Sequence, residues 1–191
     1  MLSASLQRAY GRRPGVEEVA WYVFGALSAQ RYRKDFAAAL AIDHPRVPFP
    51  ATAGAFERMA GLGRRLGAAH LLEAPILADI RFVGEGSGVV EQIRHDPDSG
   101  SVSINVSQRF TGVPSEAWKW GLGFRPLEHF LTDRKGLRLD GQQIAMFQAA
   151  ITAVRDSMTL APELDVALAD VLAETLDLRL GAPLIGRIEG R

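Results

Sequence analysis

The centre of the chain reads Val89-Val90-Glu91-Gln92-Ile93-Arg94, continues through His95 and Asp96-Pro97-Asp98-Ser99-Gly100, and ends in Ser101-Val102-Ser103-Ile104-Asn105-Val106. Apolar and polar residues alternate in both outer runs, as they do in strands that bury only one face. The pentapeptide between the runs consists of residues that favour turns. The stretch therefore predicts a β-hairpin.

On both sides of this hairpin, apolar residues recur at the three- and four-residue spacing of amphipathic helices. The predicted helical segments are residues 16–40, as one helix or a pair broken at Ser28, and residues 52–72, 142–158 and 164–180. Gly25 lies inside the first segment, where glycine costs about 1 kcal/mol relative to alanine, so we expect another element to approach closely there. The predicted fold class is α+β, with amphipathic helices flanking a small antiparallel sheet or hairpin.

Three prolines, Pro45, Pro48 and Pro50, follow the first helical segment. Proline excludes helix and pushes the residue before it toward extended dihedral angles. The sequence therefore predicts a rigid extended arm that holds Arg46 on a stiff support.

Aromatic residues gather in the first helical segment and around residue 120. Their helical spacing predicts packing in a core, rather than stacking on nucleic-acid bases, for Trp21, Tyr22, Phe24, Tyr32 and Phe36. Trp118 and Trp120 are two residues apart, so in an extended segment they would point the same way and cover the hairpin.

Length and composition are those of a globular protein. The 191 residues are 47% hydrophobic and 23% charged, and no run approaches the roughly 18 apolar residues of a membrane span. Residues 1–14 lack the apolar run of a secretory signal, so we expect a cytoplasmic protein that does not contact a membrane. We expect an N-terminal extension over residues 1–15, one domain over 16–182 and a tail over 183–191. The final tetrapeptide matches a protease cleavage site used in engineered proteins and could equally be natural sequence.

Charge is balanced overall but not along the chain. The net charge is zero, which argues mildly against a protein that holds a polyanion by itself. Residues 1–70 carry +5, residues 71–100 carry −4, residues 101–140 carry +2 and residues 141–191 carry −3. The positive charge therefore lies in the two segments that carry most of the motifs described below.

Several kinds of chemistry find no support in the sequence. The absence of cysteine excludes disulfides, thiolate nucleophiles and cysteine-dependent zinc sites. Neither a P-loop nor a methyltransferase motif occurs, and Gly84-Glu85-Gly86-Ser87-Gly88 indicates a close approach or a flexible turn rather than a phosphate cradle. Asp96, Asp98 and Ser99 indicate a solvated turn rather than calcium ligands. His129 and Asp133, four residues apart, favour a surface ion pair over a catalytic role.

The N-terminal half holds an ordered set of short motifs. In chain order these are Tyr22, Gly25, Leu27 and Ser28; Tyr32-Arg33 and Phe36; Pro45-Arg46-Val47-Pro48-Phe49; and Leu66, His70 and Leu71. The set continues with Ile104-Asn105, Phe110, Gly112-Val113, Trp118, Trp120, Gly121-Leu122-Gly123, Pro126-Leu127 and Asp133-Arg134-Lys135-Gly136. Together they cover about residues 19–165 and resemble the C-terminal specificity domain of type ISP restriction-modification enzymes.

The resemblance implies a target-recognition domain that reads double-stranded DNA for a restriction-modification system. Its implied partners are DNA and the methyltransferase and nuclease/helicase modules, in cis or in trans, and it implies no cofactor, metal or catalytic residue in this domain. In that family the domain ends a very long polypeptide, whereas this chain holds only the final part, as an excised domain, a split subunit or a gene remnant. We therefore expect no enzymatic activity from the chain by itself.

Lysine and arginine contact phosphates, while a few side chains reach base edges in the major groove. The candidate backbone contacts are Arg31, Arg33, Lys34, Arg64 and Arg65. The candidates near bases are Arg46, Arg94, Asn105, Gln108 and Arg109, and the motif residues Arg134 and Lys135 complete the DNA-binding set.

Two hypotheses that assign the chain to other functional classes stay open. The first is a protein-interaction or scaffolding domain that docks on a methyltransferase without reading bases, which the zero net charge and the acidic last helix favour. The second is a small hydrolase or metal enzyme built around His70, His95 and His129, although nothing in the sequence brings these histidines together.

Overall fold

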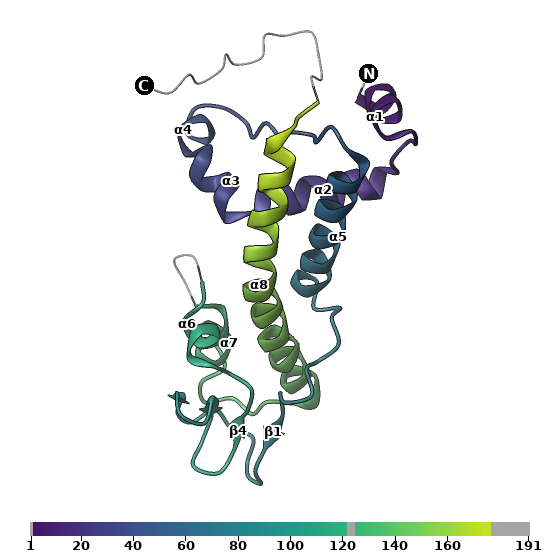
Figure 1. The fold of residues 1–191 in the computed structure, drawn as a ribbon. Helices are drawn as coiled ribbons and strands as arrows, with labels where there is room; N and C mark the ends of the chain where they lie inside the picture. The colour runs from purple at the N-terminus through teal and green to yellow at the C-terminus, as the bar shows by residue number, and fades with distance from the viewer. Residues whose placement is uncertain (1, 122–124, 177–191) are drawn as a thin grey trace. The chain divides into compact units, whose positions relative to one another are not determined.

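The structure, a computed structural model, describes residues 2–121 and 125–176 (Figure 1). The chain divides into two compact units: unit 1 comprises Met1–Arg64 with Ala161–Arg191, and unit 2 comprises Arg65–Leu160. The helices are α1 Leu2–Tyr10, α2 Val16–Ser28, α3 Gln30–Asp35, α4 Ala37–Leu40, α5 Ala53–His70, α6 Ser115–Lys119, α7 Pro126–Thr132 and α8 Gly141–Ala173. The strands are β1 Phe82–Val83, β2 Arg94–Asp96, β3 Ser101–Ser103 and β4 Arg109–Phe110.

The expected α+β class is confirmed. Leu122, Gly123 and the expected tail over residues 183–191 lie outside the described residues, and the prediction of one domain over residues 16–182 stays a prediction.

In unit 1, glycine allows α2 and α5 to cross closely. A Cβ atom added to Gly25 would lie 2.9 Å from the Met59 carbonyl oxygen, and one added to Gly63 would overlap the Trp21 carbonyl oxygen. The expected close approach at Gly25 is confirmed. The predicted break near Ser28 is also confirmed, because α2 ends there and α3 begins two residues later.

The proline-containing arm of unit 1 is held on both of its edges. The hydroxyl groups of Tyr10, Tyr22 and Tyr32 donate hydrogen bonds to the carbonyl oxygens of Pro50, Pro48 and Arg46, respectively. On the other edge, the Ala51 N–H donates to the Glu174 carbonyl and the Leu176 N–H donates to the Phe49 carbonyl. Alternate carbonyls of an extended chain point the same way, which explains the two-residue spacing of the bonds from tyrosine. The predicted extended arm is confirmed.

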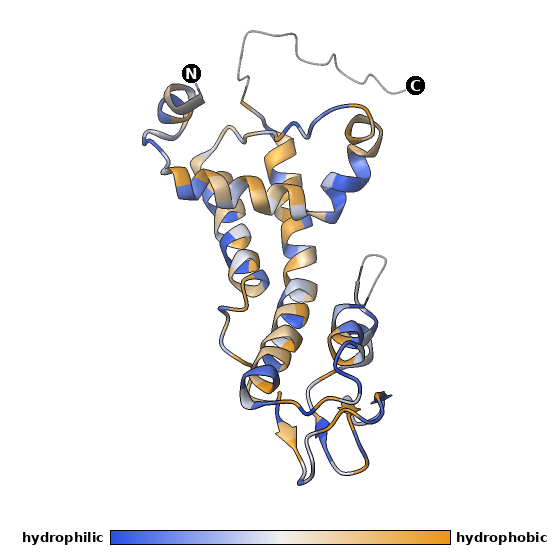
Figure 2. Ribbon diagram, turned by 180° about the vertical axis from the view of Figure 1, so that it is seen from behind, coloured by the Kyte–Doolittle hydropathy of each residue, from blue (hydrophilic) through white to orange (hydrophobic). Residues whose placement is uncertain are grey.

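The aromatic side chains of unit 1 form much of its core. Tyr22 and Tyr32 are buried, and the Tyr22 ring stacks on Phe49 and Phe56 with centroids 4.8 and 4.9 Å apart. Trp21 is only half-buried, and its indole N–H donates to Glu17. Figure 2 shows α2 as largely apolar and α3 as hydrophilic, in keeping with α2 packing in the core and α3 carrying the cluster of basic residues.

Unit 2 contains the sheet, which is antiparallel in the order β1-β4-β3-β2. The predicted hairpin is present, but its strands were placed wrongly, because pairing covers residues 94–96 and 101–103 rather than 89–94 and 101–106. The reason is that Val90 pairs elsewhere: its N–H donates to the Leu137 carbonyl, and its own carbonyl accepts from the Gly136 N–H. Partners so distant in sequence leave no local signal.

Two other predictions in this part of the chain were wrong. The helices predicted over residues 142–158 and 164–180 are one helix, α8, that runs through Pro162 and ends at Ala173; residues 177–180 lie outside the described part. Proline removes one backbone hydrogen bond, but Leu160, Leu164 and Leu168 are buried on both sides of it. Trp118 lies in α6 rather than in an extended segment, yet it does cover the hairpin, because its ring stacks on His95 with centroids 5.5 Å apart.

Within residues 2–121 and 125–176, no helix has both the length and the apolar character needed to cross a membrane.

Candidate nucleic-acid interface

The register of the sheet separates its side chains into two rows. One row pairs His95 with Val102, Val102 with Phe110, and Phe110 with Phe82. The other pairs Arg94 with Ser103, Ser103 with Arg109, and Arg109 with Val83. Directly opposite residues of an antiparallel sheet share one face, so these rows lie on opposite faces.

The first row faces the core of unit 2. Val102 and Phe110 are fully buried, and the Phe110 ring meets the Phe147 ring edge-on with centroids 4.6 Å apart. The second row is polar, with Arg94 and Arg109 exposed on either side of Ser103. The sequence alternation of the hairpin thus produces one face that packs on the core and one that faces solvent.

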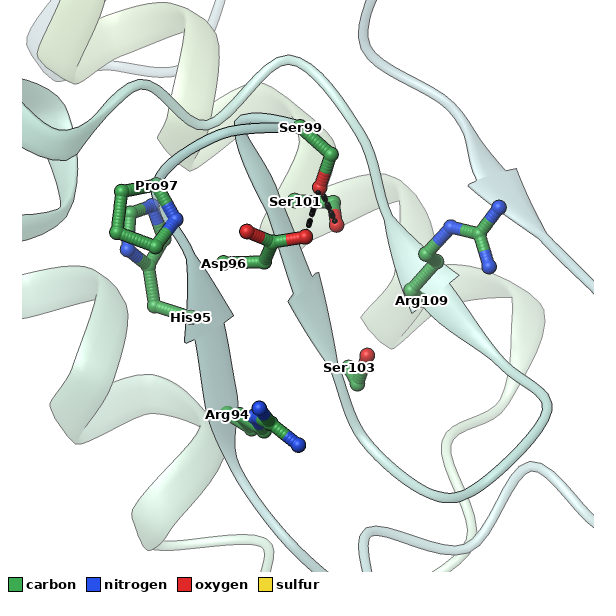
Figure 3. A pocket seen from close by; sticks show the side chains of 8 residues that line it. All are labelled: Arg94, His95, Asp96, Pro97, Ser99, Ser101, Ser103 and Arg109. Carbon is green, nitrogen blue, oxygen red and sulfur yellow. Dashed lines mark hydrogen bonds between the residues drawn. The ribbon is translucent and has the colours of Figure 1, made fainter.

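The outward face contains a hollow of about 480 Å³, which we call the sheet hollow (Figure 3). It is lined by Arg94, His95, Asp96, Pro97, Ser99, Ser101, Ser103 and Arg109. Within residues 2–121 and 125–176, the guanidinium groups of Arg94 and Arg109 form no ion pair and no hydrogen bond. Both charges are therefore available to an anionic ligand.

The turn at the rim of the sheet hollow is ordered by Asp96. Its carboxylate accepts hydrogen bonds from the Ser99 hydroxyl at 2.7 Å and from the Asp98 N–H at 3.1 Å. These bonds hold the pKa of Asp96 below its ordinary value. The bond from the Ser99 hydroxyl has the largest effect, and the nearby charge of Arg94 adds to the shift. The turn is solvated, as expected from Asp96, Asp98 and Ser99.

Asn105 and Gln108 were predicted to lie near bases, which requires exposed side chains. Both are buried, and the Asn105 amide N–H donates to the Gln108 side-chain oxygen at 2.9 Å. The Asn105 side-chain oxygen accepts from the backbone N–H groups of Ser107 and Gln108, and the Gln108 oxygen accepts from the Gly88 N–H. These side chains order two loops against each other, and their burial leaves little of their surface for a ligand.

The same loops explain the glycine-rich segment 84–88. A Cβ atom on Gly84 would overlap the Ser107 carbonyl oxygen, and one on Gly86 would lie 2.8 Å from the Gln108 side-chain oxygen. The expected close approach at these glycines is confirmed. The result is a fixed loop that leads from β3 into β4, immediately before Arg109.

The basic residues predicted in unit 1 are exposed, but two are paired. On α3, Arg31 pairs with Asp35 at 3.1 Å, Arg33 reaches the Ser28 carbonyl at 3.4 Å, and Lys34 is exposed. On the arm, Arg46 pairs with Asp43 at 2.9 Å. Arg64 is exposed on α5 and lines a small hollow with Glu17, Glu18 and Glu57. This acidic surrounding weakens the positive field around Arg64.

In unit 2, Arg65 is exposed on α5. The guanidinium of Arg134 lies 3.7 Å from the Phe130 ring centroid and donates to the Phe130 carbonyl, while Lys135 is exposed. Arg94 and Arg109 are the members of the predicted DNA-binding set that the sheet register brings from different strands to one exposed face. Asp96 and Ser103 share their face and were missed, although the period of two in residues 94–96 and 101–103 could have indicated them.

The histidines of unit 2 are engaged separately. His95 bonds to the Val113 carbonyl and stacks on Trp118, and His129 pairs with Asp133 at 3.4 Å, as the spacing predicted. Among residues 2–121 and 125–176, no group of three or more acidic, histidine or cysteine side chains could hold a metal ion. The sequence hypothesis of a metal site built on His70, His95 and His129 is therefore wrong for the described residues.

The family model of the Type ISP C-terminal specificity domain matches residues 1–160 of this chain. The chain belongs to this family. A comparison with curated proteins gave no match.

Solved structures share the fold of this specificity domain. A nuclease-deletion mutant of the Type ISP restriction-modification enzyme LlaGI in complex with a DNA substrate mimic has a TM-score of 0.58 and 20% identity, over 80% of this chain and 14% of its own. The ATP-dependent Type ISP enzyme LlaBIII bound to DNA has a TM-score of 0.59 and 21% identity, over 79% of this chain and 11% of its own. The DrdV–DNA complex has a TM-score of 0.57 and 21% identity, over 92% of this chain and 20% of its own. The specificity domain thus spans between about one-tenth and one-fifth of those chains.

Proposed function

We propose that this specificity domain recognises a target sequence in double-stranded DNA and directs the methyltransferase and nuclease modules of a restriction-modification system to it. The domain itself contributes recognition and no catalysis. The proposal is supported by membership of the specificity-domain family and by similarity to enzymes described in complex with DNA or a DNA mimic.

The observation that carries the proposal is the outward row Arg94, Ser103 and Arg109. Neighbouring strands lie about 4.8 Å apart, so the two arginine Cα atoms are separated by roughly 10 Å. The major groove of B-DNA is about 12 Å wide and admits a β-ribbon. Both guanidinium groups can therefore reach one groove, where arginine bonds guanine O6 and N7, or the phosphates along its edges.

The proposal is tested by selecting bound sequences from a random duplex DNA pool at low salt. The unchanged chain should enrich one motif, and Arg94→Ala should relax it. Arg46→Ala is the comparison variant, because Arg46 is also exposed but is paired with Asp43. Absence of any enriched motif at every salt concentration would overturn the proposal.

One observation favours a second function, docking on a methyltransferase without base readout. The segment from α3 to the arm encloses an apolar hollow of about 270 Å³, lined by residues that include Tyr32, Phe36, Leu40 and Ile42. Ile42 is 89% exposed beside it. The acidic last helix supports docking less than its composition suggested, because Asp170 pairs with Arg58 and Asp165 accepts the Arg31 N–H. Binding that is weak and independent of DNA sequence would favour the docking function.

A further inference from the structure

The sheet hollow has two ends of opposite charge. At one end, Arg94 and Arg109 flank Ser103; at the other, Asp96 lies with Ser99 and Ser101 (Figure 3). The register explains this arrangement, since Asp96 pairs directly with Ser101 one repeat along β2 from the pair of Arg94 and Ser103. A cationic end and an anionic end therefore share one face of the sheet.

The carboxylate of Asp96 is held in a defined position. The Ser99 hydroxyl donates to one of its oxygens at 2.7 Å, and the Asp98 N–H donates to the other at 3.1 Å. The Ser99 and Ser101 hydroxyl oxygens are 2.8 Å apart, which steadies the serine side. Each carboxylate oxygen can accept more than one hydrogen bond, so the group keeps acceptor capacity toward the hollow.

This end of the sheet hollow suits a hydrogen-bond donor rather than a phosphate. The pKa of Asp96 is lowered, so the carboxylate is ionised at neutral pH and repels an anion. In the major groove, the groups that donate are the amino groups N4 of cytosine and N6 of adenine, and carboxylates accept from cytosine N4. A base-pair edge offers both donors and acceptors, which matches a hollow that carries both charges.

We propose that Asp96 determines specificity: its carboxylate accepts a hydrogen bond from the exocyclic amino group of a cytosine or adenine in the major groove, beside the bases or phosphates bound by Arg94 and Arg109. This inference rests on the proposed recognition of DNA. Asp96 is two residues from Arg94, about 7 Å along the strand, and base pairs rise about 3.4 Å each. The two side chains therefore address base pairs about two steps apart.

The test repeats the sequence selection with Asp96→Asn, which keeps the size of the side chain but replaces one acceptor oxygen with a donor. Asp98→Asn is the matched control, because it makes the same change of charge two residues away and Asp98 does not line the sheet hollow. With Asp96→Asn, the preference for cytosine or adenine at one position should fall about tenfold. That position should lie about two base pairs from the one relaxed by Arg94→Ala, and Asp98→Asn should keep the original motif.

Each result bears on one of the two proposals. If the unchanged chain and Asp96→Asn enrich the same motif equally, the role of Asp96 is overturned while the proposed function stands. If the unchanged chain enriches no motif, both are overturned. Thermal unfolding of each variant checks the fold. A further variant, Ser99→Ala, removes the hydrogen bond from the Ser99 hydroxyl to Asp96 while keeping the carboxylate. If Ser99→Ala loses the motif as fully as Asp96→Asn does, the turn rather than the carboxylate sets specificity, which also overturns the inference.

Discussion

The two units use their arginines differently. In unit 1 four arginines form ion pairs: Arg12 with Glu18 and Glu57, Arg31 with Asp35, Arg46 with Asp43 and Arg58 with Asp170. On the outward sheet face of unit 2, Arg94 and Arg109 have no such partner among the described residues. Segment charge pointed first to residues 1–70, but Arg31 and Arg46, two of the predicted DNA contacts there, each have an acidic partner. The charge available to a ligand depends on neighbours in space rather than on counts along the chain.

The cores also differ in what holds them. Unit 1 uses all three tyrosines of the chain as buried or nearly buried rings whose hydroxyls bond to the arm. Unit 2 uses a sheet of two- and three-residue strands and two buried amide side chains. Changes in unit 1 should therefore affect stability, whereas changes on the sheet face should affect binding.

The largest effect is expected at the crossing of α2 and α5. Gly63→Ala places a methyl group against the Trp21 backbone, which cannot rotate away, so the helices must separate at a cost of about 3 kcal/mol. Gly61→Ala, on the same helix with nothing within 4 Å, should instead raise stability by up to about 1 kcal/mol. Urea unfolding measures both. Equal midpoints for the two variants would show that the crossing is not as close as described.

A smaller loss of stability is expected in unit 2 from Asn105→Ala. The change leaves the backbone N–H groups of Ser107 and Gln108 without their acceptor, which costs about 2 kcal/mol when such groups are buried. Val106→Ala is the control, because Val106 is next in the chain and 92% exposed. The free energy of unfolding should change little for that variant. A loss of the same size in both would mean that the loop, rather than the amide, is sensitive.

Arg94→Ala and Arg109→Ala should each weaken DNA binding about tenfold, the size of effect expected when a base contact worth about 1–3 kcal/mol is lost. Arg31→Ala, which removes a paired arginine, should change the affinity less than twofold. Titrations at several salt concentrations distinguish phosphate contacts from base contacts. Losing a phosphate contact makes the negative slope of log affinity against log salt shallower by about 0.9, whereas losing a base contact leaves the slope unchanged. Thermal unfolding should be the same for all three. An Arg31→Ala variant as weak as Arg94→Ala would break the contrast between the units.

The smallest effect concerns Tyr10. Tyr10→Phe removes the hydrogen bond to the Pro50 carbonyl and should cost about 1 kcal/mol at neutral pH. Burial raises the pKa of Tyr10 from 10.0 to about 12 in the folded chain. The unfolded chain therefore loses this proton first, and the stability that the neutral hydroxyl contributes disappears as the pH rises from 10 to 12. The difference in unfolding free energy between the two proteins should shrink over that range; a constant difference would contradict the shift.

Local features of the fold were predictable from the sequence, and features that depend on distant partners were not. The break at Ser28, the helix from residue 53 and the turn after Asp96 follow from nearby residues. The strand boundaries did not, because Val90 bonds to Gly136 and Leu137. The continuity of α8 was missed because its buried leucines compensate for Pro162.

The candidate site shows the same division. Charge alone indicated Arg94 and Arg109, but Asn105 and Gln108 were assigned to DNA because their burial depends on the glycine loop 84–88. Asp96 was interpreted as part of a solvated turn and was not among the predicted DNA contacts. Its place beside the arginines emerges from the strand register, which a one-residue shift would reverse.

The two-row register has a consequence for how such domains diversify. Val102 and Phe110 fix the sheet to its core from one face, while Arg94, Asp96, Ser103 and Arg109 occupy the other and contribute little to that packing. The outward residues can therefore be substituted without disturbing the packing of the inward face. A lineage of these domains could exchange one target for another through a few surface substitutions, and a designer could graft a foreign set of outward residues onto the same strands.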